Sequence, residues 1–233
     1  MTAWQIFYRS FITQSGYKDV LTGLKNTMII AVLGLAIGIV IGTLIAIVKV
    51  VPKEHNIFLK IMEKVCNGYV GLFRGTPIVV QLLVIYYVLF PSIGVRVDKL
   101  IVAIVAFGLN SGAYVSEIMR SGIMAVDRGQ LEAARSLGLS YARSMWEVVL
   151  PQAIKNILPT IGNEFIAHIK ETSVVSFIAV VDLTRAFQTI ASSNYEYIVP
   201  YLVLALCYLV IVLLFSSLVK LLERRMRKSD RNN

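Results

Sequence analysis

The run Thr27–Val48 contains no charged residue. A helix of this length covers the hydrocarbon core of a bilayer, which needs about 20 apolar residues. Because lipid offers no hydrogen-bond partners, the backbone of such a run must satisfy its polar groups internally, as a helix does. Tyr197–Val219 is a second uncharged run, and of all 233 residues 57% are hydrophobic and only 16% charged. The sequence therefore predicts an all-α integral membrane protein.

Weaker segments raise the predicted number of transmembrane helices to about five. They are Asn56–Phe90 with an interruption at Arg74–Pro77, Leu100–Ser116, and Ile157–Val181. The last contains Glu164, Lys170 and Glu171, which a membrane helix can carry if its polar face points into the bundle. An odd number of spans places the two termini on opposite sides of the membrane.

Basic residues predict the orientation, because Lys and Arg are enriched in cytoplasmic segments. The tail Lys220–Arg231 is densely basic, and the segments 49–64 and 120–143 carry further Lys and Arg. We therefore expect a cytoplasmic C-terminus and an N-terminus outside. The whole chain is predicted to be one transmembrane domain: an arm (1–25), a core (26–222) with a cytoplasmic insert (127–151), and a basic tail (223–233).

Two features inside the spans bear on packing. Gly34, Gly38 and Gly42 recur every four residues, and such stripes allow close helix approach, although glycine is also frequent in membrane helices generally. Gly75 and Pro77 break the second span, and irregular backbone at membrane depth is tolerated where protein or a water-filled cavity covers it. The alternative is an ordinary helix start at the membrane interface, with Arg74 reaching the headgroups.

The insert around Gly129–Ala153 is charged and helix-forming. Its sequence predicts a helix over Gln130–Leu137, ended at Gly138, and a second helix from an N-cap at Ser140 to Val149, with Pro151 opening the next element. Such an elbow could fit a groove on another protein, or lie on the headgroups as an amphipathic pair. Physical reasoning from the residues favours neither.

The insert resembles the EAA signature of ATP-binding-cassette (ABC) importer permeases. The signature comprises Glu-Ala-Ala, three residues, Gly, and a hydrophobic run ending in Leu-Pro: Glu132, Ala133, Ala134, Gly138, Leu150 and Pro151. The resemblance extends over Leu21–Arg225. Segments similar to the polar amino acid branch are Phe73–Gln81, Ala113–Ile123 and Gly162–Ser176. Glu171 departs from the Asp usual in that branch.

This resemblance implies a type I importer permease in a bacterial cytoplasmic membrane. Its partners would be a second permease subunit, identical or different, two ABC ATPase subunits, and an extracytoplasmic amino-acid-binding protein. The elbow would be the helix that couples ATPase closure to transport. The residues expected to make that contact are Glu132, Ala133, Ala134, Arg135, Gly138 and Leu139.

Nothing in the sequence indicates an enzyme. It has no phosphate-binding G-x-x-x-x-G-K-[ST] loop, no catalytic constellation and no metal-ligand spacing at its two cysteines. We therefore expect no cofactor in this chain, with ATP and Mg bound by the partner ATPase. The net charge is +9. The charged residues lie at the edges of apolar runs, which indicates contact with a lipid surface and not with nucleic acid. The alternative function is a secondary transporter or channel with intramembrane carboxylates as its ion path.

The predicted substrate site follows from the chemistry of an amino acid, which needs fixed groups of both signs. Glu164 and Glu171 are seven residues apart and share a helix face, so one could bind an ammonium group. Arg74, with the amides of Gly75 and Thr76, could bind the α-carboxylate. Asn163 and Glu117 complete the set, and the acids make a cationic substrate one candidate. Alternatively, Lys170, His168 and Arg74 simply neutralise these acids, and His168 is a proton relay or a hydrogen-bonded bundle histidine.

Overall fold

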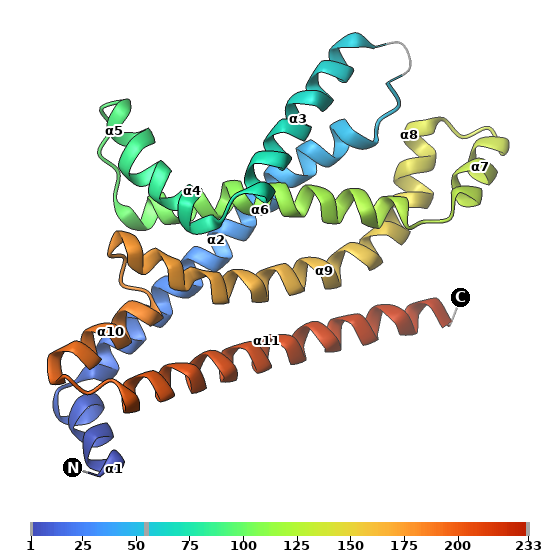
Figure 1. The fold of residues 1–233 in the computed structure, drawn as a ribbon. Helices are drawn as coiled ribbons and strands as arrows, with labels where there is room; N and C mark the ends of the chain where they lie inside the picture. The colour runs from blue at the N-terminus through green and yellow to red at the C-terminus, as the bar shows by residue number, and fades with distance from the viewer. Residues whose placement is uncertain (1, 54–55, 232–233) are drawn as a thin grey trace.

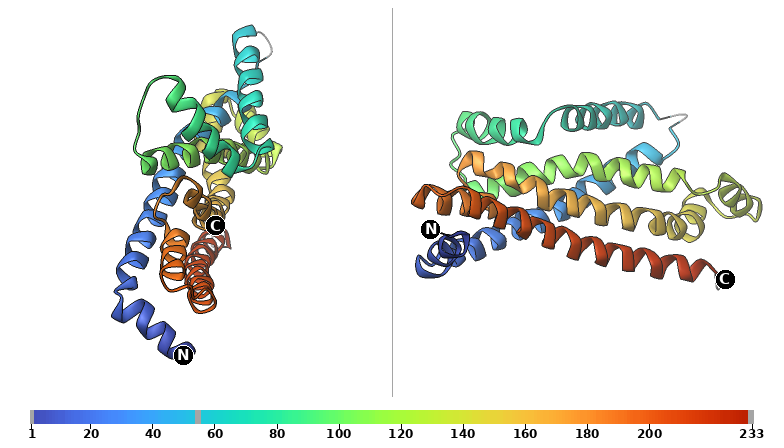
Figure 2. Two further views of the ribbon diagram at one scale, coloured as in Figure 1. Left: turned by 60° about the vertical axis from the view of Figure 1, so that its left-hand side comes forward. Right: turned by 60° about the horizontal axis from the view of Figure 1, so that its bottom comes forward.

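The computed structural model describes residues 2–53 and 56–231, with side chains up to residue 226, and every regular element in these ranges is helical (Figures 1 and 2). The α-helices are α1 (Ala3–Phe7), α2 (Gly16–Val50), α3 (Ile57–Gly75), α4 (Ile78–Val84), α5 (Phe90–Ser92), α6 (Lys99–Met124), α7 (Arg128–Ser136), α8 (Tyr141–Ser144), α9 (Leu150–Glu171), α10 (Leu183–Asn194) and α11 (Ile198–Arg231). The π-helical segments are Tyr8–Thr13, Ile85–Leu89 and Met145–Val149, and Thr172–Ile178 is a 3₁₀ helix.

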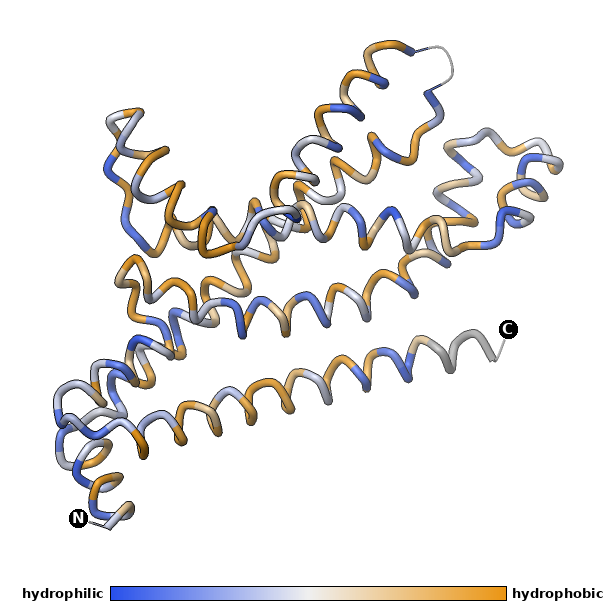
Figure 3. The backbone as a smooth tube through the Cα atoms, viewed as in Figure 1, coloured by the Kyte–Doolittle hydropathy of each residue, from blue (hydrophilic) through white to orange (hydrophobic). Residues whose placement is uncertain are grey.

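The membrane-spanning helices agree with the prediction of about five. In the described residues, α2, α6 and α11 are each long and apolar enough to cross a bilayer. Two bent helix pairs bring the number to five if each pair is one span: α3 with α4–α5, bent by 107°, and the helical stretch Tyr141–Ile178 with α10, bent by 52°. Apolar residues lie along most of α11 and along the middle of α2, whereas α7 is mostly hydrophilic (Figure 3). Helix α6 packs against α2, α3, α4 and α9, whereas α11 packs against α9 and α10.

Helix α2 begins well before the apolar run that predicted it. The chain between α2 and the π-helical segment turns at Ser15, which has a left-handed backbone with φ 58°. Residues 16–25, assigned to the N-terminal arm from the sequence, therefore form the first turns of α2. The arm itself packs through Phe11 against Phe187 of α10, with 5.6 Å between the ring centroids.

The bounds predicted for the fifth span, Ile157–Val181, differ from those of the helix in the structure. The α-helix is Leu150–Glu171, and the chain then tightens into the 3₁₀ helix. Hydroxyls favour this tighter turn: Thr172 donates to the Ile169 carbonyl and Ser176 to the Ser173 carbonyl, each three residues back. The chain after it contains α10, which Asp182 caps by accepting from the amides of Thr184 and Arg185.

Helices α2 and α6 pack through the predicted glycine stripe, which confirms its role. A Cβ added at Gly34 would lie 2.9 Å from Phe107 Cβ, and one at Gly42 would lie 2.7 Å from Val115 Cγ1. A Cβ at Gly38 would overlap Ser111. The two backbones therefore approach as only glycine permits, and this contact sets the position of α6.

We expect Gly42→Ala to destabilise the protein by about 2 kcal/mol, the usual cost of overpacking. The added methyl would also lie 2.8 Å from the backbone nitrogen of Ser116, which cannot move aside as a side chain can. Thermal unfolding in detergent measures the effect. The matched control is Gly71→Ala in α3, where a Cβ meets nothing within 4 Å. Equal unfolding temperatures for the two variants would contradict the close α2–α6 contact.

The two ends of the bundle differ in what they carry. The N-terminus and α10 lie at one end, and α7, α8 and the C-terminal end of α11 lie at the other (Figures 1 and 2). The structure therefore places the insert and the end of α11 on the same side of the bundle, as the sequence predicted for both.

Candidate functional site: a charged cavity and a projecting elbow

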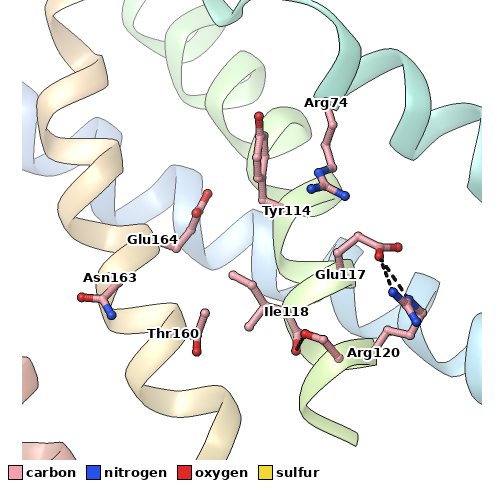
Figure 4. A pocket seen from close by; sticks show the side chains of 9 residues that line it. Arg74, Tyr114, Glu117, Ile118, Arg120, Thr160, Asn163 and Glu164 are labelled. Carbon is pink, nitrogen blue, oxygen red and sulfur yellow. Dashed lines mark hydrogen bonds and ion pairs between the residues drawn. The ribbon is translucent and has the colours of Figure 1, made fainter. Parts of the chain in front are cut away.

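A cavity of about 490 Å³ opens between α6, α9 and the end of α3 (Figure 4). Its volume lies in the range of small-molecule sites. The lining residues come from three separate parts of the chain: Arg74, Tyr114, Glu117, Ile118, Arg120, Ser121, Thr160, Asn163 and Glu164. Four predicted substrate-site residues, Arg74, Glu117, Asn163 and Glu164, are thus brought together.

Helix α9 contributes a polar face to the cavity. Thr160, Asn163 and Glu164 are three and four residues apart and so lie on one side of the helix. The Glu164 side chain is 16% exposed. In the described part of the chain its carboxylate lies within ion-pair distance of one side chain, His168, at 3.9 Å. The carboxylate is therefore available to a ligand.

Arg74 approaches the same cavity from the end of α3. Its guanidinium carbon lies 5.3 Å from the centre of the Tyr114 ring, a cation–π contact that holds the side chain over α6. Arg74 and Glu164 reach toward the cavity from different helices (Figure 4). The cavity therefore offers one fixed positive and one fixed negative group to a ligand.

Glu117 lines the cavity but is already paired. Its carboxylate lies 2.5 Å from Lys49 Nζ of α2 and 2.9 Å from Arg120 one turn along α6. Two cations neutralise this acid, so a ligand ammonium would compete with both. In this structure Glu117 thus connects α2 to α6 at the edge of the cavity.

The structure does not place the predicted amide donors, at the break between α3 and α4, in the cavity lining. Arg74 and Gly75 form the last turn of α3, where helical amides are already bonded four residues back. Gly75 and Thr76 are absent from the cavity lining. The Thr76 hydroxyl donates to the Leu72 carbonyl.

The break instead leaves backbone carbonyl groups without helical partners, and two buried side-chain amides donate to them. Gln81 Nε2 lies 2.8 Å from the Phe73 carbonyl and 2.9 Å from the Thr76 carbonyl. Asn110 of α6 donates to Gln81 Oε1 at 2.9 Å. Gln81 and Asn110 are 8% and 4% exposed. These two residues hold the bend that places Arg74 at the cavity.

Glu171 ends α9 and lies outside the cavity. Its Oε2 is 3.9 Å from His168 Nδ1, and its side chain is 45% exposed. Glu164 and Glu171 share a helix face as predicted, with His168 between them. The Phe107 backbone is the one hydrogen-bonding neighbour indicated for His168 in the described residues, but it is not placed for a regular hydrogen bond to either ring nitrogen.

The elbow at the other end of α9 is built by the EAA residues. Gly138 has φ +86°, and the amides of Gly138 and Leu139 bond the carbonyls of Arg135 and Ala134. This pairing is a Schellman motif, which needs a left-handed residue at the helix end. Arg135 also donates to the Leu139 carbonyl at 3.0 Å. Gly138 and Ser140 thus have the capping roles that the sequence predicted.

The faces of the elbow differ in exposure. Glu132, Ala133 and Arg135 are exposed, whereas Ala134 is only 4% exposed and packs inside the elbow. Leu137 and Trp146 are 84% and 74% exposed. Exposed apolar side chains of this kind mark a surface that contacts either a protein or a membrane.

The second helix of the elbow does not end at Val149 as predicted. Helix α8, the π-helical segment Met145–Val149 and α9 follow without interruption. Pro151 has no N–H to donate to the Glu147 carbonyl, and the wider π turn lies at this missing bond. The elbow is therefore continuous with the helix that carries Thr160, Asn163 and Glu164.

Buried charges of both signs within a bundle of membrane spans are typical of transport proteins. Comparison with known proteins agrees: the chain belongs to the family described as binding-protein-dependent transport system inner membrane component, whose model matches residues 38–228. The resemblance to polar amino acid ABC importer permeases is thereby confirmed, as is a multi-pass location in the plasma membrane. The chain is a transport subunit and not an enzyme.

Named relatives cover nearly the whole chain. The arginine transport system permease protein ArtQ of Bacillus subtilis is 38% identical, over 91% of this chain and 94% of its own. The glutamine transport system permease protein GlnP of Escherichia coli is 38% identical, over 88% and 91%.

Solved structures match the fold. An amino acid ABC transporter with histidines has a TM-score of 0.83 and 43% identity, over 92% of this chain and 98% of that one. The methionine transporter MetNI, in an inward-facing conformation, has a TM-score of 0.75 at 16% identity, which supports the fold alone.

Proposed function

We propose that this chain carries a polar amino acid across the membrane as part of an ATP-driven importer. The observation that supports this most is the cavity with Arg74 on one side and Glu164 on the other. An α-carboxylate fits a guanidinium, whose planar fork can donate two parallel hydrogen bonds. An α-ammonium or a cationic side chain fits the Glu164 carboxylate. The relatives named for arginine and glutamine are consistent with this substrate class.

The proposed assembly follows the family. Two permease subunits, identical or different, surround the path, two ABC ATPases bind at the elbows, and an extracytoplasmic receptor delivers the substrate. ATP and Mg bind to the ATPases. The coupling contact is assigned to Glu132, Ala133, Arg135, Gly138 and Leu139, with Ala134 shaping the turn from inside. Because the elbow continues into α9, its displacement would tilt the helix that carries Glu164, as rigid-body rocking requires.

We expect Glu164→Gln to raise the substrate concentration for half-maximal uptake about tenfold. The variant removes one charged hydrogen bond, and tenfold corresponds to about 1.4 kcal/mol. Uptake by proteoliposomes containing the whole complex measures it, with L-glutamine and L-arginine as probes. Glu147→Gln is the control, since Glu147 is half exposed and pairs with Arg143 on the elbow side. An unchanged half-saturation value with intact basal ATPase activity would remove Glu164 from the site.

The proposed orientation places the elbow in the cytoplasm and the end of α10 outside. Ser140→Cys and Ser193→Cys, each made in a chain with Cys66 and Cys207 replaced by Ala, test it because both serines are exposed. In intact cells, an impermeant thiol reagent should label the Ser193 variant and spare the Ser140 variant. Labelling of the Ser140 variant from outside would refute both the orientation and the coupling role.

A further inference from the structure

His168 is a buried polar side chain whose neighbouring backbone group at Phe107 is not placed for a regular hydrogen bond. Its side chain is 0% exposed and its ring stands edge-on to Phe107, with 5.4 Å between centroids. Neither ring nitrogen forms a hydrogen bond with the described residues. A buried polar group without a partner is costly, so each such group in a native structure calls for a specific explanation.

Two carboxylates lie at the same distance from Nδ1. Glu164, one turn before His168, and Glu171, just under one turn after it, each place an oxygen 3.9 Å from Nδ1. This separation is too long for a hydrogen bond. Rotation of the terminal torsions of either glutamate can shorten it without moving the helix, because these torsions are broad. His168 therefore lies within reach of Glu164 without being bonded to it.

Glu164 both lines the cavity and lies near His168. It lines the cavity with Arg74 and Asn163, whereas His168 does not reach it. One carboxylate can thus face either a ligand in the cavity or the imidazole behind it. A strong contact with one weakens the contact with the other.

We propose that His168 is a positioning residue that exchanges with the substrate for the Glu164 carboxylate. With substrate bound, Glu164 faces the cavity and binds the cationic group. As the substrate leaves, Glu164 turns to His168, whose Nδ1–H donates to it. The proposal rests on the proposed substrate role of Glu164.

Two opposite effects on transport follow from this exchange. Without a donor at residue 168, Glu164 loses one competing partner, so the substrate binds more tightly. Release then lacks the interaction that replaces the substrate, so turnover slows. A purely structural histidine would not lower the half-saturation concentration, because a loosened site binds substrate more weakly.

The matched pair His168→Leu and His168→Asn tests the exchange. Leu and Asn have nearly the same shape, but only Asn keeps a donor near the Nδ1 position. In proteoliposomes containing the whole complex, with L-arginine and L-glutamine as probes, we expect His168→Leu to lower the half-saturation concentration about three- to tenfold. Its maximal rate should fall by a similar factor, and His168→Asn should restore both values toward those of the native protein. Basal ATPase activity and size-exclusion profiles check that the complexes are intact.

Several outcomes would overturn the proposal. An unchanged or raised half-saturation concentration in His168→Leu would do so, as would equal behaviour of the Leu and Asn variants. If His168→Leu does not fold, His168→Phe takes its place, since it keeps an aromatic ring against Phe107 and removes the donor. Failure of the proposed substrate site is recognised separately, because Glu164→Gln would then leave the half-saturation concentration unchanged.

Discussion

Gly138→Val is expected to reduce ATP-driven uptake by about a hundredfold while leaving the protein folded and in the membrane. Gly138 has φ +86° and a Cβ there would meet nothing within 4 Å, so the effect comes from the backbone. A β-branched residue is strained at positive φ, and the Schellman turn that binds the Ala134 and Arg135 carbonyls would open. A displacement of about 1 Å in a coupled element can cost a hundredfold in rate.

Gly94→Val is the matched control for the elbow. Gly94 has φ +70° and equally open surroundings, so the substitution adds similar strain, but Gly94 follows α5 and lies far from the elbow in the chain. Uptake measured per unit of membrane-inserted protein should fall strongly only in the Gly138 variant, through weaker ATPase association or uncoupled hydrolysis. Similar losses in both variants would mean that backbone strain in general, and not the elbow, limits transport.

Gln81→Leu is expected to destabilise the protein by about 3 kcal/mol or more. The substitution removes the Gln81 donor from the Thr76 carbonyl and the Gln81 acceptor from Asn110, and it leaves the Phe73 carbonyl with the longer 3.4 Å hydrogen bond from Asn110 Nδ2. Each unsatisfied buried group costs about 1–3 kcal/mol, and within a membrane bundle water is not freely available to replace them. Because Gln81 holds the bend between α3 and α4, Arg74 should also lose its position over Tyr114.

Thermal unfolding of the detergent-solubilised protein checks this, with Gln130→Leu as the control. Gln130 is exposed on α7, so the same loss of an amide should leave the unfolding temperature nearly unchanged. A Gln81 variant as stable as the native protein would show that other groups or water satisfy the break.

Features set by local sequence were predictable. The apolar runs gave the spans, because burial in lipid depends on composition over about 20 residues. The turn at Gly138 and the cap at Ser140 were correct, because capping needs a particular residue type at one position. The stripe of Gly34, Gly38 and Gly42 was also predicted correctly, because its four-residue spacing places all three residues on one helix face.

Features that depend on distant residues were not predictable. Glu117 was predicted to bind substrate, and nothing in the sequence indicated that Lys49 from another helix pairs with it. Tyr114 and Thr160 are ordinary in sequence and became part of the cavity only when α6 and α9 packed together. A polar Gln81 close after the break at Pro77 was the one signal that could have indicated how the freed carbonyls are satisfied.

The measurement that tests most directly whether this chain is an ATP-driven permease is uptake by proteoliposomes containing the permease, its ATPase and its receptor. We predict that L-arginine or L-glutamine accumulates only when ATP is supplied on the ATPase side, and that collapsing all ion gradients leaves accumulation intact. Accumulation driven by an ion gradient without ATP would contradict this and support a secondary transporter that uses the carboxylates of Glu117, Glu164 and Glu171.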